Sequence, residues 1–216
     1  MIGRTDVVSR RLVLVVIACV GLTAGGLADA ADDAAVLQVS QGTVTFEVGT
    51  NVPALRVLGK SSAVKAYARV RLGPEGAMVE HVEASVPVTS LRTGLALRDE
   101  HMRKHIFTRA DGQVPDVRFS AERASCPTLG SKQRITCEVI GMLVIQGVAR
   151  PFTIALALVE DHGALRAAGS GIVKLSAYGI EQPSQLGVRT ADDVKLRLEF
   201  TAGRPAAQVA ADAGAR

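Results

Sequence analysis

The side chains best suited to chemistry lie close together between Arg98 and His105. Asp99 and His101 offer an acid and a base, while His101 and His105, four residues apart, have the spacing of two metal ligands on one helix face. The order is Glu-His-x-x-x-His rather than the His-Glu-x-x-His of zinc proteases, and no third ligand is indicated, so we predict structural or solvated histidines. Asp99 and His101 lie roughly 200° apart around a helix and therefore do not face each other.

Catalysis finds little further support in the chain. No serine has the context of a nucleophile elbow, and no motif marks a pair of carboxylates. His81 and His162 are expected to be solvated. We therefore predict no catalytic residue and no metal. A small-molecule hydrolase or isomerase that uses Asp99 and His101 at the mouth of the fold remains the alternative from a different class.

These residues belong to Thr89–Ser120, the only long stretch whose pattern indicates a helix. Thr93 is the expected N-cap. At about 100° per residue, four apolar residues share one face: Leu91, Leu95, Met102 and Ile106. Arg98 and Asp99 project from this same face. We expect them to be satisfied by each other, by backbone or by a ligand, because burying an unpaired charge is costly.

The first 30 residues have the pattern of a secretory signal peptide. Basic residues come first, an apolar run begins at Leu12, and Ala28-Asp29-Ala30 provides a cleavage site. We expect an exported protein cleaved after Ala30, with a linker over residues 31–35. Two alternatives stay open: a lipoprotein acylated at Cys19, and a retained membrane anchor.

Composition narrows the function classes. The chain has 25 basic and 21 acidic residues, and removing the three basic and two acidic residues of the signal leaves 22 and 19, a net charge of +3. This weak positive balance disfavours nucleic acid, which requires a dense basic face. Aromatic residues make up 3% and Trp is absent, which disfavours a surface that stacks sugars or bases.

Cys126 and Cys137 remain in the mature chain, on either side of a turn-like segment, residues 127–133. In an oxidising compartment an even number of cysteines favours a disulfide. A redox-active pair is the alternative, but the C-x-x-C spacing is missing. We predict a structural disulfide across a hairpin.

The rest of the mature chain alternates apolar and polar residues, the pattern of half-buried antiparallel strands. Eight or nine such strands without a βαβ rhythm indicate a closed barrel or a sandwich, and we predict an all-β antiparallel barrel of about eight strands with one inserted α-helix, because closure removes exposed edges. Small inward residues leave volume for one small ligand. Alternatively, they only pack against each other and the helix. An Ala-rich tail over residues 203–216 has no periodicity and is predicted to be disordered.

Several motifs follow one another at compatible spacings. They are Ser90-Leu-Arg-Thr-Gly94, Arg98-Asp-Glu-His-Met-Arg103, Phe107, Pro115-Asp-Val-Arg-Phe-Ser120, Gly141-Met-Leu-Val-Ile-Gln-Gly-Val-Ala-Arg-Pro151 and Tyr178-Gly-Ile180. Together they resemble the signature of the YceI-like family, from about Leu37 to Thr201, and we assign the domain to residues 36–202. The resemblance implies a lipocalin-like extended barrel in the periplasm, whose apolar lumen holds a polyisoprenoid, an isoprenoid quinone tail or a long fatty amide. It implies neither catalysis nor a metal.

The chain departs from the family pattern at two places. Val39-Ser40-Gln41-Gly42 stands where the family often has an Asp and a His-Ser, and Leu175 and Ala177 stand where it commonly has Arg and Asp. Polar groups for a ligand head group are therefore missing, which makes the helix end near Arg98 the expected polar contact. The residues expected to contact a ligand in the lumen or at its mouth are Phe46, Val48, Ala66, Ala68, Val86, Val88, Leu95, Arg98, Asp99, Met102, Ile106, Phe107, Phe119, Leu143, Phe152, Ile154, Leu156, Gly169, Gly171, Tyr178, Leu196 and Leu198.

The expected partner is a long-chain isoprenoid lipid that the protein carries or stores, with no other cofactor and no nucleic acid. A transient membrane or envelope partner and a homodimer stay open. So does an envelope stress or interaction protein with a filled barrel and no ligand.

Overall fold

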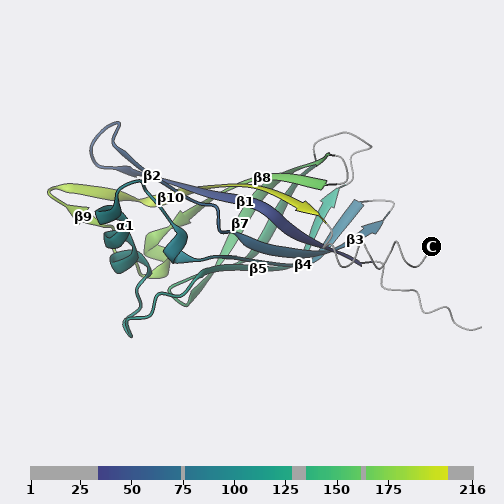
Figure 1. Ribbon diagram of the computed structural model, residues 1–216, viewed down its shortest axis with the longest axis horizontal. Helices are drawn as coiled ribbons and strands as arrows, with labels where there is room; N and C mark the ends of the chain where they lie inside the picture. Colours follow the sequence, from purple (N-terminus) through teal and green to yellow (C-terminus); the bar gives the residue numbers. More distant parts are fainter. Residues whose placement is uncertain (1–33, 74–75, 128–134, 162–163, 204–216) are drawn as a thin grey trace, which may run out of the picture. The chain divides into compact units, whose positions relative to one another are not determined.

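The structure, a computed structural model, describes residues 34–73, 76–127, 135–161 and 164–203 (Figure 1). The predicted signal peptide, most of the linker and nearly all of the tail lie outside the described residues, as does His162. Within these ranges the chain forms ten antiparallel strands: β1 Ala34–Thr50, β2 Arg56–Ser61, β3 Lys65–Gly73, β4 Gly76–Val86, β5 Val117–Pro127, β6 Ile135–Ile145, β7 Val148–Asp161, β8 Ala164–Lys174, β9 Ser184–Gln185 and β10 Val188–Gly203.

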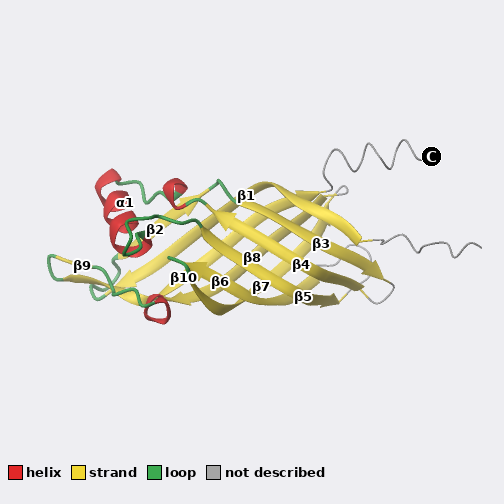
Figure 2. Cartoon of the chain, turned by 90° about the horizontal axis from the view of Figure 1, so that it is seen from below, coloured by secondary structure: helices red, strands yellow, loops and turns green. Residues whose placement is uncertain are grey.

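Eight of these strands close a barrel in the order β1-β3-β4-β5-β6-β7-β8-β10, because β10 pairs back onto β1. The two additional strands extend it at one end, β2 beside β1 and β9 beside the start of β10 (Figure 2). The predicted all-β antiparallel barrel of about eight strands is therefore confirmed.

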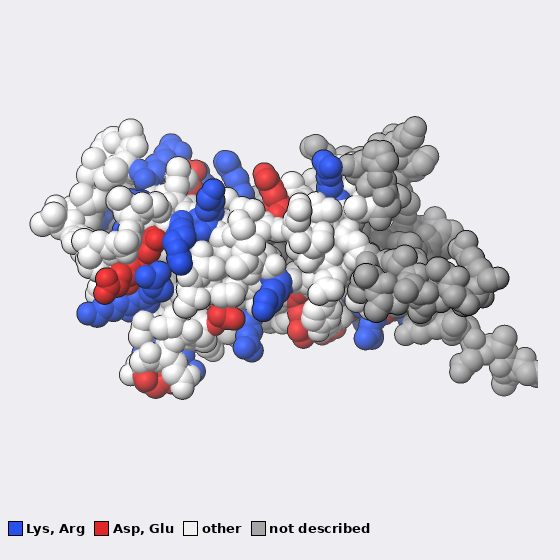
Figure 3. Space-filling model, viewed as in Figure 1, with Lys and Arg blue, Asp and Glu red and all other residues white. Residues whose placement is uncertain are grey.

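The period of two in the sequence determines which side chains enter the barrel. Phe46 of β1 lies opposite Leu196 of β10, and Val44 lies opposite Leu198, so apolar residues of adjacent strands meet on the inner face. The residues between them, such as Lys195, point outward, and the outer face carries interspersed basic and acidic side chains (Figure 3).

Along one edge, the strand β1 pairs first with β3 and then with β2. Its first part pairs with β3 over residues 34–38, and after a bulge at Ser40 its second part pairs with β2 over residues 44–49. In the described part of the chain, the other edge of β2 has no strand partner, and its backbone is joined to the segment after β4 by a bridge between Lys60 and Arg92. At this end the barrel wall is therefore not completed by a strand.

Three short helices complete it. They are the 3-10 helix η1 Val88–Ser90, the α-helix α1 Ala96–Met102 and the π-helical turn η2 Arg103–Phe107, and residues 88–107 are called the lid below (Figure 2). A further 3-10 turn, η3 Leu175–Tyr178, follows β8. Among the residues that the structure describes, no helix has the length and apolar character that crossing a membrane requires.

The helix is shorter than the sequence pattern predicts, and two details of that prediction are wrong. The α-helix begins at Ala96 with Leu95 as N-cap, so Thr93 does not cap it, and the Leu95 side chain is 59% exposed rather than on the buried face. Gly94 has a φ of +86°, which turns the chain between these residues and breaks the assumed periodicity.

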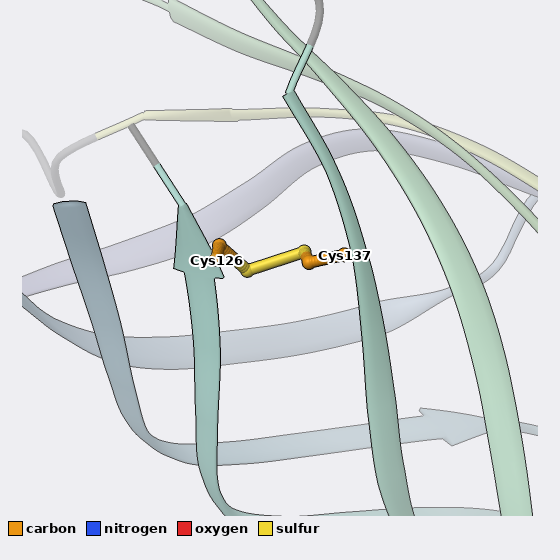
Figure 4. The surroundings of a disulfide bond; sticks show 2 residues. All are labelled: Cys126 and Cys137. Carbon is orange, nitrogen blue, oxygen red and sulfur yellow. A yellow bond between two sulfur atoms is a disulfide. The ribbon is translucent and has the colours of Figure 1, made fainter. Parts of the chain in front are cut away.

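The predicted disulfide is present between Cys126 of β5 and Cys137 of β6, whose Cα atoms are 5.0 Å apart (Figure 4). The register Arg118–Val144 would place Cys126 opposite Thr136. Pairing Cys126 with Cys137 instead requires one extra residue in β5 between Ser120 and Cys126. Arg123, which has a φ of +57°, lies in this interval and is the position at which the extra residue fits. The disulfide, Leu158 and Ala167 form a separate small core at the end of the barrel away from the lid.

Candidate functional site

The barrel encloses a cavity of about 130 Å³ directly beneath the lid. The strands β1, β6 and β10 and the lid contribute most of its lining. The lining residues are Val44, Phe46, Val48, Val86, Leu91, Met102, Ile106, Phe107, Val117, Leu143, Ile145, Val173, Leu175, Thr190, Val194 and Leu196. None of these described residues is ionisable, so the cavity offers no acid or base to a bound molecule.

Thr190 is the single polar residue of this lining. Its hydroxyl oxygen is buried and has no hydrogen-bond partner among the described residues. The position follows from a register shift in the β1–β10 ladder, where Val48 pairs with Val194 but Thr50 pairs with Thr190. Burying an unpaired hydroxyl is unfavourable, so a ligand that reaches this oxygen, which lies beside the cavity but is not exposed to it, would gain a hydrogen bond.

A buried carboxylate joins α1 to the preceding part of the lid. Asp99 is 4% exposed, and its Oδ1 accepts two hydrogen bonds from Thr93, from the backbone N at 2.7 Å and from Oγ1 at 2.6 Å. Burial disfavours the charged form of Asp99, but the bonds from Thr93 outweigh it and lower the pKa of the carboxyl. Asp99 is therefore held as an anion inside the lid.

Arg98 completes this joint from the same helix turn. Its Nε donates to Thr93 Oγ1 at 2.8 Å and its Nη2 donates to the Thr93 carbonyl at 2.7 Å. The sequence left three possible partners for these two charges: each other, the backbone or a ligand. In the structure both charges bond to the backbone and the hydroxyl group of Thr93. Neither Arg98 nor Asp99 lines the cavity.

Two further contacts hold the ends of the lid. The Ser61 hydroxyl of β2 lies 2.6 Å from the Ser90 hydroxyl of η1, beside the backbone bridge between Lys60 and Arg92. At the other end, Gln146 Nε2 in the β6–β7 turn donates to the carbonyl of Ile106 at 2.6 Å. The lid is thus fixed by polar contacts at its rim and by apolar contacts over the cavity.

Aromatic rings fill part of the remaining lumen by lying over glycines of neighbouring strands. A Cβ at Gly59 would meet the ring of Phe46, and a Cβ at Gly171 would meet the ring of Phe152. The rings of Phe119 and Phe152 also contact each other edge to face, with centroids 6.3 Å apart. The open volume is therefore concentrated near the lid rather than along the whole barrel.

The fold and cavity can now be compared with those of known proteins. Residues 36–202 match the model of the YceI-like domain. The chain belongs to the YceI-like family. No curated protein matches the chain.

Solved structures share the fold of this YceI-like chain at low sequence identity. BcnA of Burkholderia cenocepacia has 16% identity and a TM-score of 0.57, over 74% of this chain and 95% of that one. A polyisoprenoid-binding domain from Saccharophagus degradans, implicated in plant cell wall breakdown, has 12% identity and a TM-score of 0.56, over 78% and 98%. The Campylobacter jejuni YCEI protein has 17% identity and a TM-score of 0.55, over 72% and 89%.

The YceI-like barrel brings some of the residues named from the sequence into one cavity and leaves others outside it. Those that line the cavity are Phe46, Val48, Val86, Met102, Ile106, Phe107, Leu143 and Leu196. Others belong to the apolar core without lining it: Val88, Phe119, Phe152, Ile154, Leu156, Tyr178 and Leu198. Burial raises the pKa of Tyr178, and Arg150 offsets part of this. Ala66 and Ala68 are partly exposed on β3, and Leu95 is exposed on the lid.

Gly169 and Gly171 are positions at which the sequence allows either a sharp bend of the strand or close approach of a ligand to the backbone; in the structure side chains cover both glycines. A Cβ at Gly169 would lie 2.7 Å from Leu156 Cδ2, and the ring of Phe152 covers Gly171. Side chains of β7 occupy the space that these glycines leave.

Sequence reasoning omitted several lining residues. Val44 and Val194 share the inner face with Phe46 and Leu196, so their alternation was a sufficient signal. Leu91 belongs to the predicted apolar face of the helix but is missing from the residues predicted to contact a ligand. Thr190 carried no signal, because nothing local distinguishes it from a surface threonine.

Proposed function

We propose that this protein holds the apolar tail of a polyisoprenoid, or of a similar long-chain amphiphile, in its barrel and carries or stores that lipid in the periplasm. The observation that carries the proposal is the lining of the cavity: apart from Thr190, every residue is aliphatic, Met or Phe. Such a surface binds by burying hydrocarbon, and about ten buried methylene groups contribute about 8 kcal/mol before ordering costs.

Membership of the YceI-like family supports this assignment. The Saccharophagus degradans domain of the same fold is described as polyisoprenoid-binding. The pattern of residues 1–30 and the Cys126–Cys137 disulfide support export to an oxidising compartment.

The size of the cavity bears on how such a chain enters. At about 130 Å³ it is smaller than the roughly 300–1,000 Å³ of pockets that enclose drug-sized ligands. A long tail therefore requires more room than the closed lid leaves, and we propose that the lid moves outward when the chain enters. Arg98 and Asp99 then hold the parts of this movable element together, through Thr93, rather than act as an acid and a base.

The polar end of the ligand is expected to follow from Thr190. Its unpartnered hydroxyl can donate to a carbonyl or ether oxygen, or exchange a hydrogen bond with an alcohol, at the wall of the cavity. A lipid with an oxygen close to its apolar tail, such as a quinone or a fatty amide, provides that group. A pure hydrocarbon does not.

Extraction of the protein purified from its native host tests the proposal. Organic extraction followed by mass spectrometry should release a long-chain lipid, and native mass spectrometry should show a complex of matching mass. Protein that is consistently free of lipid, and that also takes up no isoprenoid quinone when this is offered, would contradict the proposal.

A pair of adjacent substitutions localises the binding. Val194 lines the cavity, whereas Lys195 points outward. Val194→Trp should fill the cavity and lower quinone uptake by about tenfold or more, while Lys195→Trp should leave uptake unchanged. Circular dichroism and thermal unfolding establish that both variants are folded, and equal uptake by both would place the ligand elsewhere.

A further inference from the structure

The end of the barrel that carries the lid exposes leucines on three separate segments. Leu55 lies in the β1–β2 loop, Leu97 on α1 and Leu186 in the β9–β10 turn, and these side chains are 45%, 65% and 98% exposed. Figures 1 and 2 show all three segments at this end. Other exposed apolar residues, such as Ile140 and Ile172, lie on the strands of the barrel wall.

Two of these segments are held together by polar contacts. The Asn51 backbone N donates to the carbonyl of Arg189 at 2.9 Å, and the Arg189 backbone N donates to Asn51 Oδ1 at 2.8 Å. Asn51 Nδ2 also donates to the carbonyl of Gly187 at 3.1 Å. The tips that carry Leu55 and Leu186 are therefore a joined pair.

Leu186 occupies a backbone conformation that does not suit leucine. Its φ is +51° and that of Gly187 is +79°, the two positive values of a hairpin turn that favours Asn-Gly. The side chain makes almost no contact with the protein that would compensate for this conformation, since it is 98% exposed. A strained residue that projects an apolar side chain into water points to a role outside the fold.

Positive charge surrounds these leucines. Residues 51–60, 89–109 and 181–190 contain eight Lys and Arg against three Asp and Glu, one of which is the buried Asp99. Two of these arginines, Arg56 and Arg109, form ion pairs with Glu47 and Asp111, which lie just outside these ranges. Counting those two acids leaves an excess of +3, equal to the net charge of the mature chain, so the remaining residues have no positive excess. Figure 3 shows basic and acidic side chains near this end, behind an uncharged tip.

We propose that this end of the protein docks on the surface of an anionic lipid bilayer. Leucines on protruding tips enter the boundary between head groups and acyl chains, and Lys and Arg set behind them face the anionic head groups. The end that docks is the end beneath which the apolar cavity lies. The purpose of docking, to pass a lipid between bilayer and cavity, rests on the proposed function, whereas docking itself does not.

The arrangement favours a bilayer over a protein surface. The centre of a protein–protein interface is depleted of Lys and requires shape complementarity, whereas here narrow tips from different segments alternate with basic residues. A bilayer adapts to such tips and supplies the negative charge.

Flotation of the full protein with vesicles tests the proposal. Binding should be strong to phosphatidylglycerol mixed with phosphatidylcholine, weak to phosphatidylcholine alone, and reduced by high salt. Leu186→Asn restores the residue that the turn favours, so it should raise the melting temperature while lowering vesicle binding by about tenfold. The control Ile172→Asn, on an exposed wall residue, should leave vesicle binding unchanged.

Three results would overturn docking: no binding to the anionic vesicles, equal binding by wild type and Leu186→Asn, or a dimer in light scattering that Leu186→Asn dissociates, which would make a second copy the occupant. Extraction of lipid from the same preparations separates the two proposals. Bound lipid without vesicle binding removes only docking, and vesicle binding without any lumen lipid removes only the proposed function.

Discussion

Replacing Asp99 by Asn removes a charge from the joint that holds the lid while keeping the shape of the side chain. Both hydrogen bonds from Thr93 end on the same oxygen, Oδ1, so an amide oxygen can accept both. Hydrogen bonds to a charged partner contribute about 1.5–3 kcal/mol each and neutral ones about 0.5–1.5 kcal/mol. Making both bonds neutral therefore lowers their stabilisation by about 2–3 kcal/mol in total. The neutral amide is easier to bury than the carboxylate, which offsets part of this loss.

We expect Asp99→Asn to lower the free energy of unfolding by about 2 kcal/mol at neutral pH. For a domain of this size that is a fall in melting temperature of about 4–8 °C. Asp99→Ala should lose about 3–5 kcal/mol, because it leaves the Thr93 N–H without an acceptor. Thermal unfolding followed by circular dichroism measures both, with the disulfide intact.

The pH dependence distinguishes this explanation from a general packing defect. The pKa of Asp99 is lowered in the folded protein, so its contribution is complete above the pKa of the unfolded chain and is lost as the pH falls through the folded pKa. The difference between wild type and Asp99→Asn should therefore shrink below about pH 4, as wild-type Asp99 takes up a proton. Glu100→Gln, at the exposed neighbouring acid, is the control. A difference that stays constant down to low pH, or that Glu100→Gln reproduces, would refute the reasoning.

Four further predictions concern other parts of the structure. Gly171→Ala brings a Cβ against the ring of Phe152 and should cost about 1–3 kcal/mol in chemical denaturation, whereas at Gly49 the nearest atom, Ala191 Cβ, is 4.0 Å away and Gly49→Ala should be nearly neutral. The double variant Cys126→Ser, Cys137→Ser should lose about 2–3 kcal/mol, and thiol titration of the denatured, unreduced mature protein should detect neither thiol if the disulfide is intact. Thr190→Val removes the unpartnered hydroxyl and should stabilise lipid-free protein by about 1 kcal/mol while weakening quinone binding several-fold; unchanged binding would show that no ligand oxygen meets it. The hydrogen bond that His81 donates to Glu122 raises the pKa of His81 despite the opposing effect of burial, so Glu122→Gln should lower that pKa in an NMR titration. This contact stabilises the fold fully below the unfolded pKa of His81, and the stabilisation disappears as the pH rises through the folded pKa.

The barrel was predictable because the alternation of apolar and polar residues within each strand shows which face is buried. Val44, Phe46 and Val48 alternate with polar residues, and all three line the cavity. The disulfide was predictable for a similar reason, since its cysteines flank one short turn-like segment and adjacent strands bring them together. Local patterns suffice where a contact joins neighbours in sequence or follows a period of two.

The lid was predicted less well because its geometry depends on polar contacts that hydrophobic periodicity does not indicate. Thr93 is a good N-cap residue, but its N–H and hydroxyl are engaged by Asp99, six residues later, and the helix begins beyond Gly94. The π-helical turn after Met102 then changes the angle between successive side chains. The same limit applies to Thr190, whose burial follows from a register shift between β1 and β10.

The incomplete wall explains why the cavity and the lid occur at the same end. Elsewhere in the described residues each wall strand is paired on both sides, and separating two strands would break backbone hydrogen bonds of a ladder; the shortest of these ladders joins β5 to β6 over three residue pairs. Beside β2, the backbone link to the lid consists of two hydrogen bonds, Lys60 N to Arg92 O at 2.8 Å and Arg92 N to Lys60 O at 2.9 Å. Releasing these bonds and the contact between Ser61 and Ser90 separates the lid from β2 while the ladder of the barrel stays intact. A place where the wall can open therefore adjoins the apolar volume, and a chain too long for about 130 Å³ can enter there without unfolding the barrel.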